Sequence, residues 1–209
     1  MERHQYEIQR EAASRGVREL FHFTPSPNVR SILCDGLLSR QVLATRGIPF
    51  LATDPMRLDE HLEAVSLSVH SINESMLAAK RREYVGQWLV FVLDASILWT
   101  HECRFCWRNA ASNEIRHHRG FIGGPWAFRK MFDDRPMSVV DSRSSREALG
   151  LLDRQPTDNA AEVQVLEPIV PELIRGVFAP NHRLKLELEA LMQSIGRVRP
   201  VKVLEDLCR

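Results

Sequence analysis

A carboxylate at the start of a predicted strand is the residue of this chain best placed to do chemistry. Within residues 157–171, a polar turn leads into a short alternating segment that begins with Glu162. Val163 and Val165 fall on one face of such a strand, so Glu162 and Gln164 fall on the other. The alternative is an ordinary glutamate on a solvated strand edge, which is the commoner case. Glu162 therefore needs partners from other segments before a reaction can be assigned to it.

Two candidate partners lie on an earlier strand, predicted for residues 17–24. Phe21 and Phe23 alternate with His22 and Thr24 along it, so the two polar side chains share a face. Ser26-Pro27 then favours a helix start, and a glycine at position 36 is placed to end that helix. The structural alternatives are a hydrogen-bonded core histidine for His22 and a turn-starting residue for Thr24.

Further polar groups come from a predicted loop over residues 46–59 and a strand over residues 64–69. The loop carries Arg46 and Arg57, and the strand carries Ser66 and Ser68 on the face opposite its valines. Arg57 has a structural alternative, a surface ion pair with a neighbouring carboxylate, which contributes little to stability. The structural alternative for the two serines is that they form the polar face of a half-buried strand.

Composition excludes several classes of protein. The chain has 209 residues, of which 44% are hydrophobic and 26% charged, which is typical of a globular domain. Its apolar runs are too short to span a bilayer, and the first 15 residues lack the apolar segment of a signal peptide, so we expect a cytoplasmic protein without membrane contact. Walker, dinucleotide-binding and zinc-protease motifs do not occur in the sequence.

Cysteine spacing gives a weak indication of metal. Cys103-x-x-Cys106 follows His101, but a structural zinc site usually needs a second such pair, and the sequence has none. We therefore expect reduced thiols and no metal. The same region, residues 99–121, interleaves aromatic and basic side chains, which would suit stacking on unpaired bases unless the aromatic residues belong to the core.

The order of the predicted elements indicates an α+β fold. Strands and helices are mixed without regular β-α-β alternation. A closing helix carries Leu184, Leu188, Leu191 and Ile195 on one stripe. We expect a single domain over residues 1–209, with residues 1–16 as an N-terminal lead-in and residues 181–209 as a C-terminal helix and tail. The polar segment 138–158 is predicted to be mobile.

Four blocks of sequence, taken in order, resemble the DarT family of DNA ADP-ribosyltransferase toxins. Each block alone is a weak signal, but the four together in the same order are fairly specific. They cover most of residues 17–180 and comprise Leu20-Phe21-His22-Phe23-Thr24 with Asn28 and 31–38, then 88–94, then Asn109-Ala110-Ala111-Ser112, then 156–171.

The resemblance implies an ADP-ribosyltransferase-like fold, in which a split, bent mixed β-sheet with flanking helices holds NAD. It implies a toxin of a toxin–antitoxin or phage-defence system that transfers ADP-ribose from NAD to a base in single-stranded DNA, with a macrodomain antitoxin as partner. By position, Glu162 would be the catalytic carboxylate. Arg57, in preference to Arg46, would be the arginine serving the target base. The NAD-binding residues implied are His22, Phe23, Thr24, Asn28, Ser31, Ser66 and Ser68.

The target base is predicted from residues 64–73. The thymine-modifying branch of the family carries an aromatic, proline-rich block there, whereas this chain has Ala-Val-Ser-Leu-Ser-Val-His-Ser-Ile-Asn. This favours guanine over thymine. The alternatives are an ADP-ribosyltransferase that acts on RNA or protein, and a catalytically inactive relative that binds nucleic acid.

The predicted residues also fit the reaction on chemical grounds. Cleavage of the nicotinamide–ribose bond develops positive charge on the ribose, and a carboxylate bonded to the 2′-hydroxyl stabilises that charge. Loss of one such preorganised interaction typically costs about 3–4 kcal/mol of barrier, or ~10²–10³ in rate. An arginine near the acceptor can position a base, but it is a poor proton acceptor at its ordinary pKa.

Overall fold

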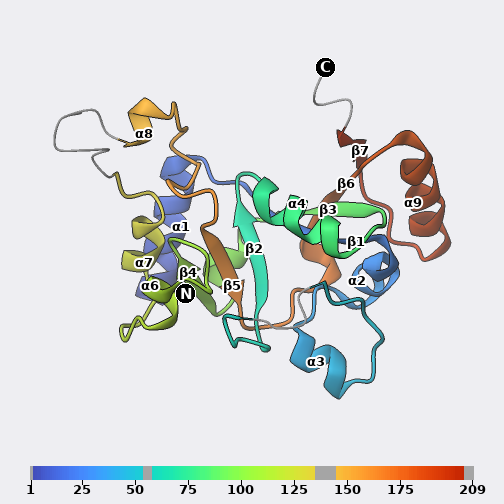
Figure 1. The fold of residues 1–209 in the computed structure, drawn as a ribbon, viewed down its shortest axis with the longest axis horizontal. Coiled ribbons are helices and arrows are strands. Elements are labelled where there is room, and N and C mark those ends of the chain that lie inside the picture. Colours follow the sequence, from blue (N-terminus) through green and yellow to red (C-terminus); the bar gives the residue numbers. More distant parts are fainter. Residues whose placement is uncertain (1, 54–57, 135–144, 205–209) are drawn as a thin grey trace.

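The computed structural model of the chain describes residues 2–53, 58–134 and 145–204 (Figure 1). Helices and strands are mixed along the chain, which confirms the α+β prediction. In order, the elements are α1 (Arg3–Arg15), β1 (Glu19–Pro25), η1 (Ser26–Asn28), α2 (Val29–Asp35), α3 (Arg40–Thr45), β2 (Val65–Val69), α4 (Glu74–Glu83), β3 (Trp88–Asp94), α5 (Ile97–Thr100), β4 (Cys103–Cys106), α6 (Asn113–Arg116), α7 (Pro125–Lys130), α8 (Ser145–Ala148), β5 (Glu162–Val165), η2 (Pro171–Leu173), β6 (Ile174–Ala179), α9 (His182–Ser194) and β7 (Val201–Val203).

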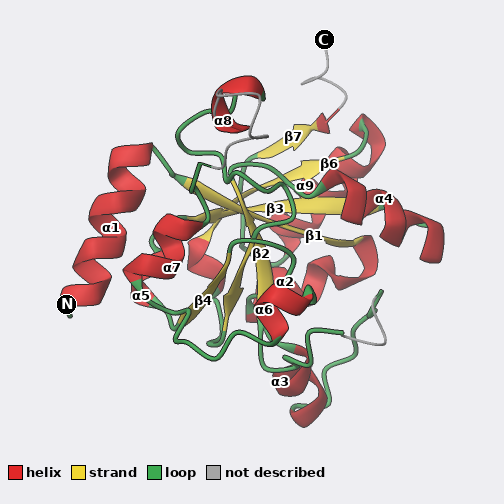
Figure 2. Ribbon diagram, turned by 60° about the vertical axis from the view of Figure 1, so that its left-hand side comes forward, coloured by secondary structure: helices red, strands yellow, loops and turns green. Residues whose placement is uncertain are grey.

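The described strands form one seven-stranded sheet in the order β4-β5-β2-β1-β3-β6-β7. Only two residue pairs, Leu20 with Val69 and Phe21 with Ser68, join β2 to β1, whereas seven pairs join β1 to β3. The strands on either side of this short join run in clearly different directions (Figure 2). The sheet is therefore bent and split between β1 and β2, as the resemblance implied.

The centre of the larger half is β3. Six of its residues, from Trp88 to Leu93, are buried, because β1 and β6 flank the strand and helices cover both of its faces. A continuous apolar run is what such a strand requires. Leu20, His22 and Thr24 lie on one face of β1. Leu20 and Thr24 are buried, so this face points towards the interior of the protein, next to the split.

The smaller half carries the predicted glutamate. β5 pairs with β4 on one side and with β2 on the other, and Val163 and Val165 are completely buried. The alternation expected for this strand is present. Gln164, however, is also fully buried instead of lying on a solvated face.

A glycine is required where α2 ends against the chain that follows β5. Gly36 has φ 87°, and its neighbour Leu37 exchanges two backbone hydrogen bonds with Ile169 at 2.9 and 3.0 Å. A Cβ atom at position 36 would lie 2.1 Å from the Ile169 carbonyl oxygen. This close approach fixes the end of α2 beside the split in the sheet.

Helices cover the two halves separately. α1 packs against α5 and α7 beside the smaller half, through the buried Ile8 and Ala12, while α9 packs against β6 and β7. The leucine stripe predicted for α9 faces the core, with Leu188 and Met192 buried. No helix within the described residues is long and apolar enough to cross a bilayer.

Candidate active site

Two adjoining cavities lie at the split between β1 and β2. The first is lined by β1, by α2 and by residues 50–53 of the following loop, and the second by β1, β2, α4 and the start of β5. The two cavities share the side chains of His22, Phe23, Arg40, Thr53 and Ser66. A ligand longer than either cavity could therefore extend through both.

The structure brings the sequence-predicted residues together at these cavities. Five of them, with Ser66, line the first cavity: His22, Phe23, Thr24, Asn28 and Ser31. Ser68 and Glu162 line the second. Their proposed roles remain predictions. Arg57 lies outside the described residues. Arg46 is exposed at the C-terminal end of α3 and lines neither of the two cavities.

Glu162 is oriented by the backbone of a distant segment. Its Oε1 accepts a hydrogen bond from the Ala110 N–H at 2.8 Å, and Ala110 and Ala111 line the same cavity. The Asn109 side chain accepts from the Ala111 N–H at 2.8 Å, which folds this turn back on itself. Segment 109–111 therefore holds the carboxylate in one orientation, and Asn109 shapes the turn that does so.

His22 bridges the split in the sheet. Its Nδ1 lies 3.0 Å from the Ser66 carbonyl oxygen on β2. A carbonyl oxygen can only accept, so Nδ1 carries the proton, and the neutral ring has its acceptor at Nε2. His22 can therefore have a structural and a functional role at once, because the hydrogen bond that joins the two half-sheets also determines which ring nitrogen carries the proton.

Asn28 fixes the loop that closes the first cavity. Its Oδ1 accepts from the Leu51 N–H at 2.8 Å, and its Nδ2 donates to the Leu51 carbonyl and to the Thr24 hydroxyl, each at 3.0 Å. Ser31 donates to the Asp35 carboxylate at 3.4 Å on the same helix. Both residues line the first cavity, and the Asn28 amide is hydrogen-bonded within the protein.

The buried Gln164 connects β4 to the loop that carries Asp59, a residue that lines the second cavity. Gln164 Oε1 accepts from the Arg104 guanidinium at 2.8 Å, and Gln164 Nε2 donates to the Asp59 carboxylate. Glu60, next along the chain, pairs with Arg116 at 2.6 Å. The loop over residues 58–63 is thereby attached to the smaller half-sheet and to α6.

Cys103 and Cys106 lie on opposite faces of β4. Burial raises the pKa of both thiols to about 12, and the nearby Glu162 carboxylate adds to the shift at Cys106. Both side chains therefore remain neutral thiols. Throughout residues 2–53, 58–134 and 145–204, no three His, Cys, Asp or Glu side chains gather where they could hold a metal ion.

Sequence reasoning missed Arg40, the arginine that lines both cavities within the described part of the chain. It is the first residue of α3, a six-residue helix that lies in no block of the resemblance and whose N-cap is Ser39. The signal available was Ser39 as a helix-starting residue before Arg40. Of the aromatic residues suggested for base stacking, Phe105 and Trp107 are buried in the core, while Phe121 is 73% exposed.

The split, bent sheet with flanking helices is an ADP-ribosyltransferase-like fold, and the two cavities and the fixed glutamate lie at its split. One family profile, described as "ssDNA thymidine ADP-ribosyltransferase, DarT", matches residues 21–207. The chain belongs to the DarT family. No curated protein matches it in sequence.

Solved DarT structures share the fold. Thermosipho africanus DarTG in complex with ADP-ribose is 16% identical with a TM-score of 0.55; the match covers 89% of this chain and 50% of that one. Thermus sp. 2.9 DarT in complex with NAD⁺ is also 16% identical, with a TM-score of 0.59 and coverage of 88% and 93%. The same protein in complex with ADP-ribosylated ssDNA is 16% identical with a TM-score of 0.52, and the match covers 88% of this chain and 92% of that one. This chain thus spans half the length of the DarTG chain.

Proposed function

We propose that this chain transfers ADP-ribose from NAD to a base of single-stranded DNA and releases nicotinamide. The observation that carries the proposal is the position of Glu162, whose carboxylate is fixed by the Ala110 N–H in a cavity that continues into a second one. Membership of the DarT family supports the same reaction, and a DarT of the same fold has been solved with NAD⁺.

The first cavity and the part it shares with the second fit NAD. Arg40 can bind the pyrophosphate, because a guanidinium donates two parallel hydrogen bonds to phosphate oxygens. His22 can accept from a ribose hydroxyl through Nε2, since its Nδ1 is bonded to Ser66. Phe23, Thr24 and Ser31 complete the wall, and Asn28 acts indirectly by holding Leu51 in place.

Glu162 supplies the catalytic charge. Because one carboxylate oxygen is held by Ala110, the side chain is preorganised before substrate arrives. The carboxylate stabilises positive charge on the ribose as the nicotinamide bond breaks, in the way carboxylates do in glycoside hydrolysis. Arg57 remains our candidate for the arginine that positions the base, while Arg40 faces the cavities within the described part of the chain.

We propose guanine as the acceptor in preference to thymine. The aromatic, proline-rich block of the thymine branch does not occur between Ala64 and Asn73. The second cavity is also lined by the Asp59 carboxylate, which accepts from Gln164, and by the Lys80 ammonium, which pairs with Glu83. Guanine can donate to a carboxylate from both N1 and N2 and can accept at O6 and N7, whereas thymine has a single donor, N3–H.

The proposed setting is a toxin–antitoxin or phage-defence system of the cytoplasm. DarTG of Thermosipho africanus shares the fold over half its length and was solved with ADP-ribose. We propose a macrodomain antitoxin as the partner of this chain, acting on the ADP-ribose mark.

The proposal is tested with labelled NAD and single-stranded oligonucleotides that contain guanine or thymine as the only reactive base. Label should enter the guanine oligonucleotide, and Glu162→Gln should lower the rate ~10²–10³-fold. Mass spectrometry of the digested product identifies the base.

Matched RNA oligonucleotides and the protein itself serve as competing acceptors in the same reaction. Label on RNA or protein with none on DNA would replace the proposed substrate class. Equal background labelling by the wild type and Glu162→Gln would instead favour the inactive nucleic-acid-binding relative.

A further inference from the structure

A third cavity adjoins the second one and shares none of its described lining residues with the first. It is lined by residues 16–19 before and at the start of β1, by Phe21, and by His70 and Arg154. Phe21 also lines the second cavity, so the two meet at this side chain. Two of the lining residues, Arg18 and Arg154, are cationic, against the single carboxylate of Glu19. The third cavity is thus a basic extension of the site that holds Glu162.

The third cavity lies one short step along the sheet from the glutamate. The antiparallel register that pairs Leu67 with Val163 brings Ser68 opposite Glu162, and Ser68 pairs with Phe21 on the other side. β2 ends at Val69, and His70 follows it directly, so the third cavity begins where this strand ends. One extended polymer could therefore occupy both the second and the third cavity.

His70 is held in a conformation that turns the chain out of the strand. Its φ is 68°, a left-handed value that is uncommon for any residue other than glycine, and such strain is found preferentially at functional sites. Its Nδ1 accepts a hydrogen bond from the Arg154 Nε at 3.2 Å. Burial and the neighbouring Arg154 both lower the pKa of His70, so the ring stays a neutral acceptor and orients the guanidinium.

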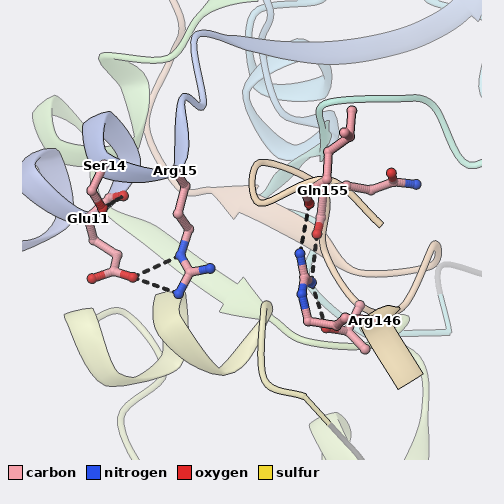
Figure 3. Close-up of polar contacts among 7 residues, drawn as sticks. Glu11, Ser14, Arg15, Arg146 and Gln155 are labelled. Carbon is pink, nitrogen blue, oxygen red and sulfur yellow. Dashed lines mark hydrogen bonds and ion pairs between the residues drawn. The ribbon is translucent and has the colours of Figure 1, made fainter. Parts of the chain in front are cut away.

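The segment that carries Arg154 is itself fixed by another arginine. Arg146 donates to the Leu152 carbonyl at 2.7 Å, to the Gln155 carbonyl at 2.8 Å and to the Thr157 hydroxyl at 2.9 Å (Figure 3). These acceptors lie on both sides of Arg154 in sequence. The Arg154 backbone is therefore held in place before any ligand arrives, which reduces the entropy lost on binding.

We propose that the third cavity binds a backbone phosphate of the acceptor strand, next to the base that enters the second cavity. Arg18 and Arg154 are exposed, and within the described residues neither forms an ion pair. Guanidinium groups bind phosphate oxygens through paired hydrogen bonds. This inference rests on the proposed function, because it takes the polymer to be the single-stranded nucleic acid that is modified.

A phosphate of NAD is the other possible source of the same chemistry. Among the described residues, the first cavity has five in common with the second and none in common with the third, which shares only Phe21 with the second. NAD that lies in the first cavity and in its overlap with the second would therefore leave the third cavity to another ligand. The acceptor strand also has to enter the second cavity, and it can extend from there into the third.

The test compares the wild-type chain with Arg154→Ala, Arg18→Ala and the double variant. Arg183→Ala is the matched control, because Arg183 is an exposed arginine on α9 that lines none of the three cavities. Binding of a fluorescent single-stranded oligonucleotide is measured by anisotropy at several salt concentrations. The KM for NAD is measured in parallel from nicotinamide release.

Each cavity variant should raise the Kd for the oligonucleotide about tenfold to a hundredfold, for guanine-rich and thymine-rich sequences alike. The slope of log affinity against log salt should fall by about 0.7 for each arginine–phosphate interaction that a variant removes. Arg183→Ala should match the wild type, and the KM for NAD should not change in any variant. Arg154→Lys should recover part of the affinity.

Two results would overturn the inference: oligonucleotide binding equal to that of Arg183→Ala, or a raised KM for NAD with unchanged oligonucleotide binding. The binding measurement does not depend on transfer. A chain that modifies no DNA would therefore contradict the proposed function, while the salt slopes would still show whether Arg18 and Arg154 contact phosphate.

Discussion

At the scale of single residues, Arg40 is the described cationic residue that lines both cavities of the proposed NAD site. It is half-buried at the first turn of α3, beside His22 and Ser66, where a pyrophosphate would be partly shielded from water. Electrostatic interactions at such a site are stronger than at an exposed one. Arg46, six residues later, is exposed and serves as a natural comparison.

Arg40→Ala should raise the KM for NAD about tenfold to a hundredfold, because a charge-assisted hydrogen bond contributes roughly 1.5–3 kcal/mol. The measurement is initial rates of nicotinamide release over a range of NAD concentrations. Arg46→Ala should leave the KM unchanged. A lower kcat at constant KM in Arg40→Ala would contradict a binding role and assign Arg40 to the chemical step.

The three cysteines in the described part of the chain differ sharply in reactivity. Cys34 is exposed, whereas Cys103 and Cys106 are buried with pKa values of about 12. Since the thiolate is the nucleophile, iodoacetamide at pH 8 should alkylate Cys34 in the native protein and spare the other two until denaturant is added. Peptide mass spectrometry separates the sites.

The same pKa values predict how the stability of the protein changes with pH. The folded pKa of each buried thiol lies above its unfolded value near 9, so the stabilisation is fully present below pH 9 and is lost as the pH rises towards 12. The free energy of unfolding should therefore fall over this range. The fall should be smaller in Cys106→Ala than in the wild type; an equal fall would exclude Cys106 as its source.

At the scale of elements, the loop over residues 58–63 depends on β5. Gln164 is fully buried and joins Arg104 on β4 to Asp59 in that loop, behind the cavity that Glu162 lines. Buried polar groups that lose their partners cost about 1–3 kcal/mol. Gln164 is thus expected to position the loop without touching substrate.

Gln164→Leu should lower the free energy of unfolding by about 1–3 kcal/mol, as measured by urea denaturation. It should also raise the KM for the oligonucleotide, since Asp59 lines the second cavity, with a smaller effect on the KM for NAD. Gln164→Glu is a matched variant, because a carboxylate keeps the bond to Arg104 but repels Asp59. Equal stability of Gln164→Leu and the wild type would contradict the positioning role.

Element prediction succeeded where periodicity and end signals agree. β1, α2, β2, β5 and α9 were expected from alternation, helix end signals or helical spacing, and they appear within a few residues of the predicted limits. β4, β6 and β7 were not assigned, since short strands that gain their stability from neighbours carry little local pattern. Of the segment predicted to be mobile, residues 138–144 lie outside the described residues, while Arg146 fixes the chain after α8.

At the scale of the whole molecule, the two halves of the sheet meet through two residue pairs and the His22–Ser66 hydrogen bond. The cavities at this split have walls from both halves, so a ligand that fills them would join the halves together. The interpretation of residues 1–209 as one domain remains a prediction.

NAD at a hundredfold excess over its Kd should raise the melting temperature by about 5–10 °C. Binding to the folded state alone contributes about 2.7 kcal/mol at that excess, and a domain of this size shifts by roughly 2–4 °C per kcal/mol. Differential scanning fluorimetry measures the shift, and Glu162→Gln should retain it because the glutamate acts on the reacting ribose. The absence of a shift in both proteins would contradict NAD binding at the split.

The amino-acid sequence by itself determined the fold class, the family blocks and the strand face on which Glu162 lies, because strand alternation, helix signals and short motifs are local properties. Only the tertiary structure decided that Ala110 fixes Glu162, that Gln164 is buried, and that Arg40 and Arg154 line neighbouring cavities. These contacts join segments far apart in the chain, across the split in the sheet and through the loops around it. Their positions depend on how the half-sheets pack, which no local pattern encodes.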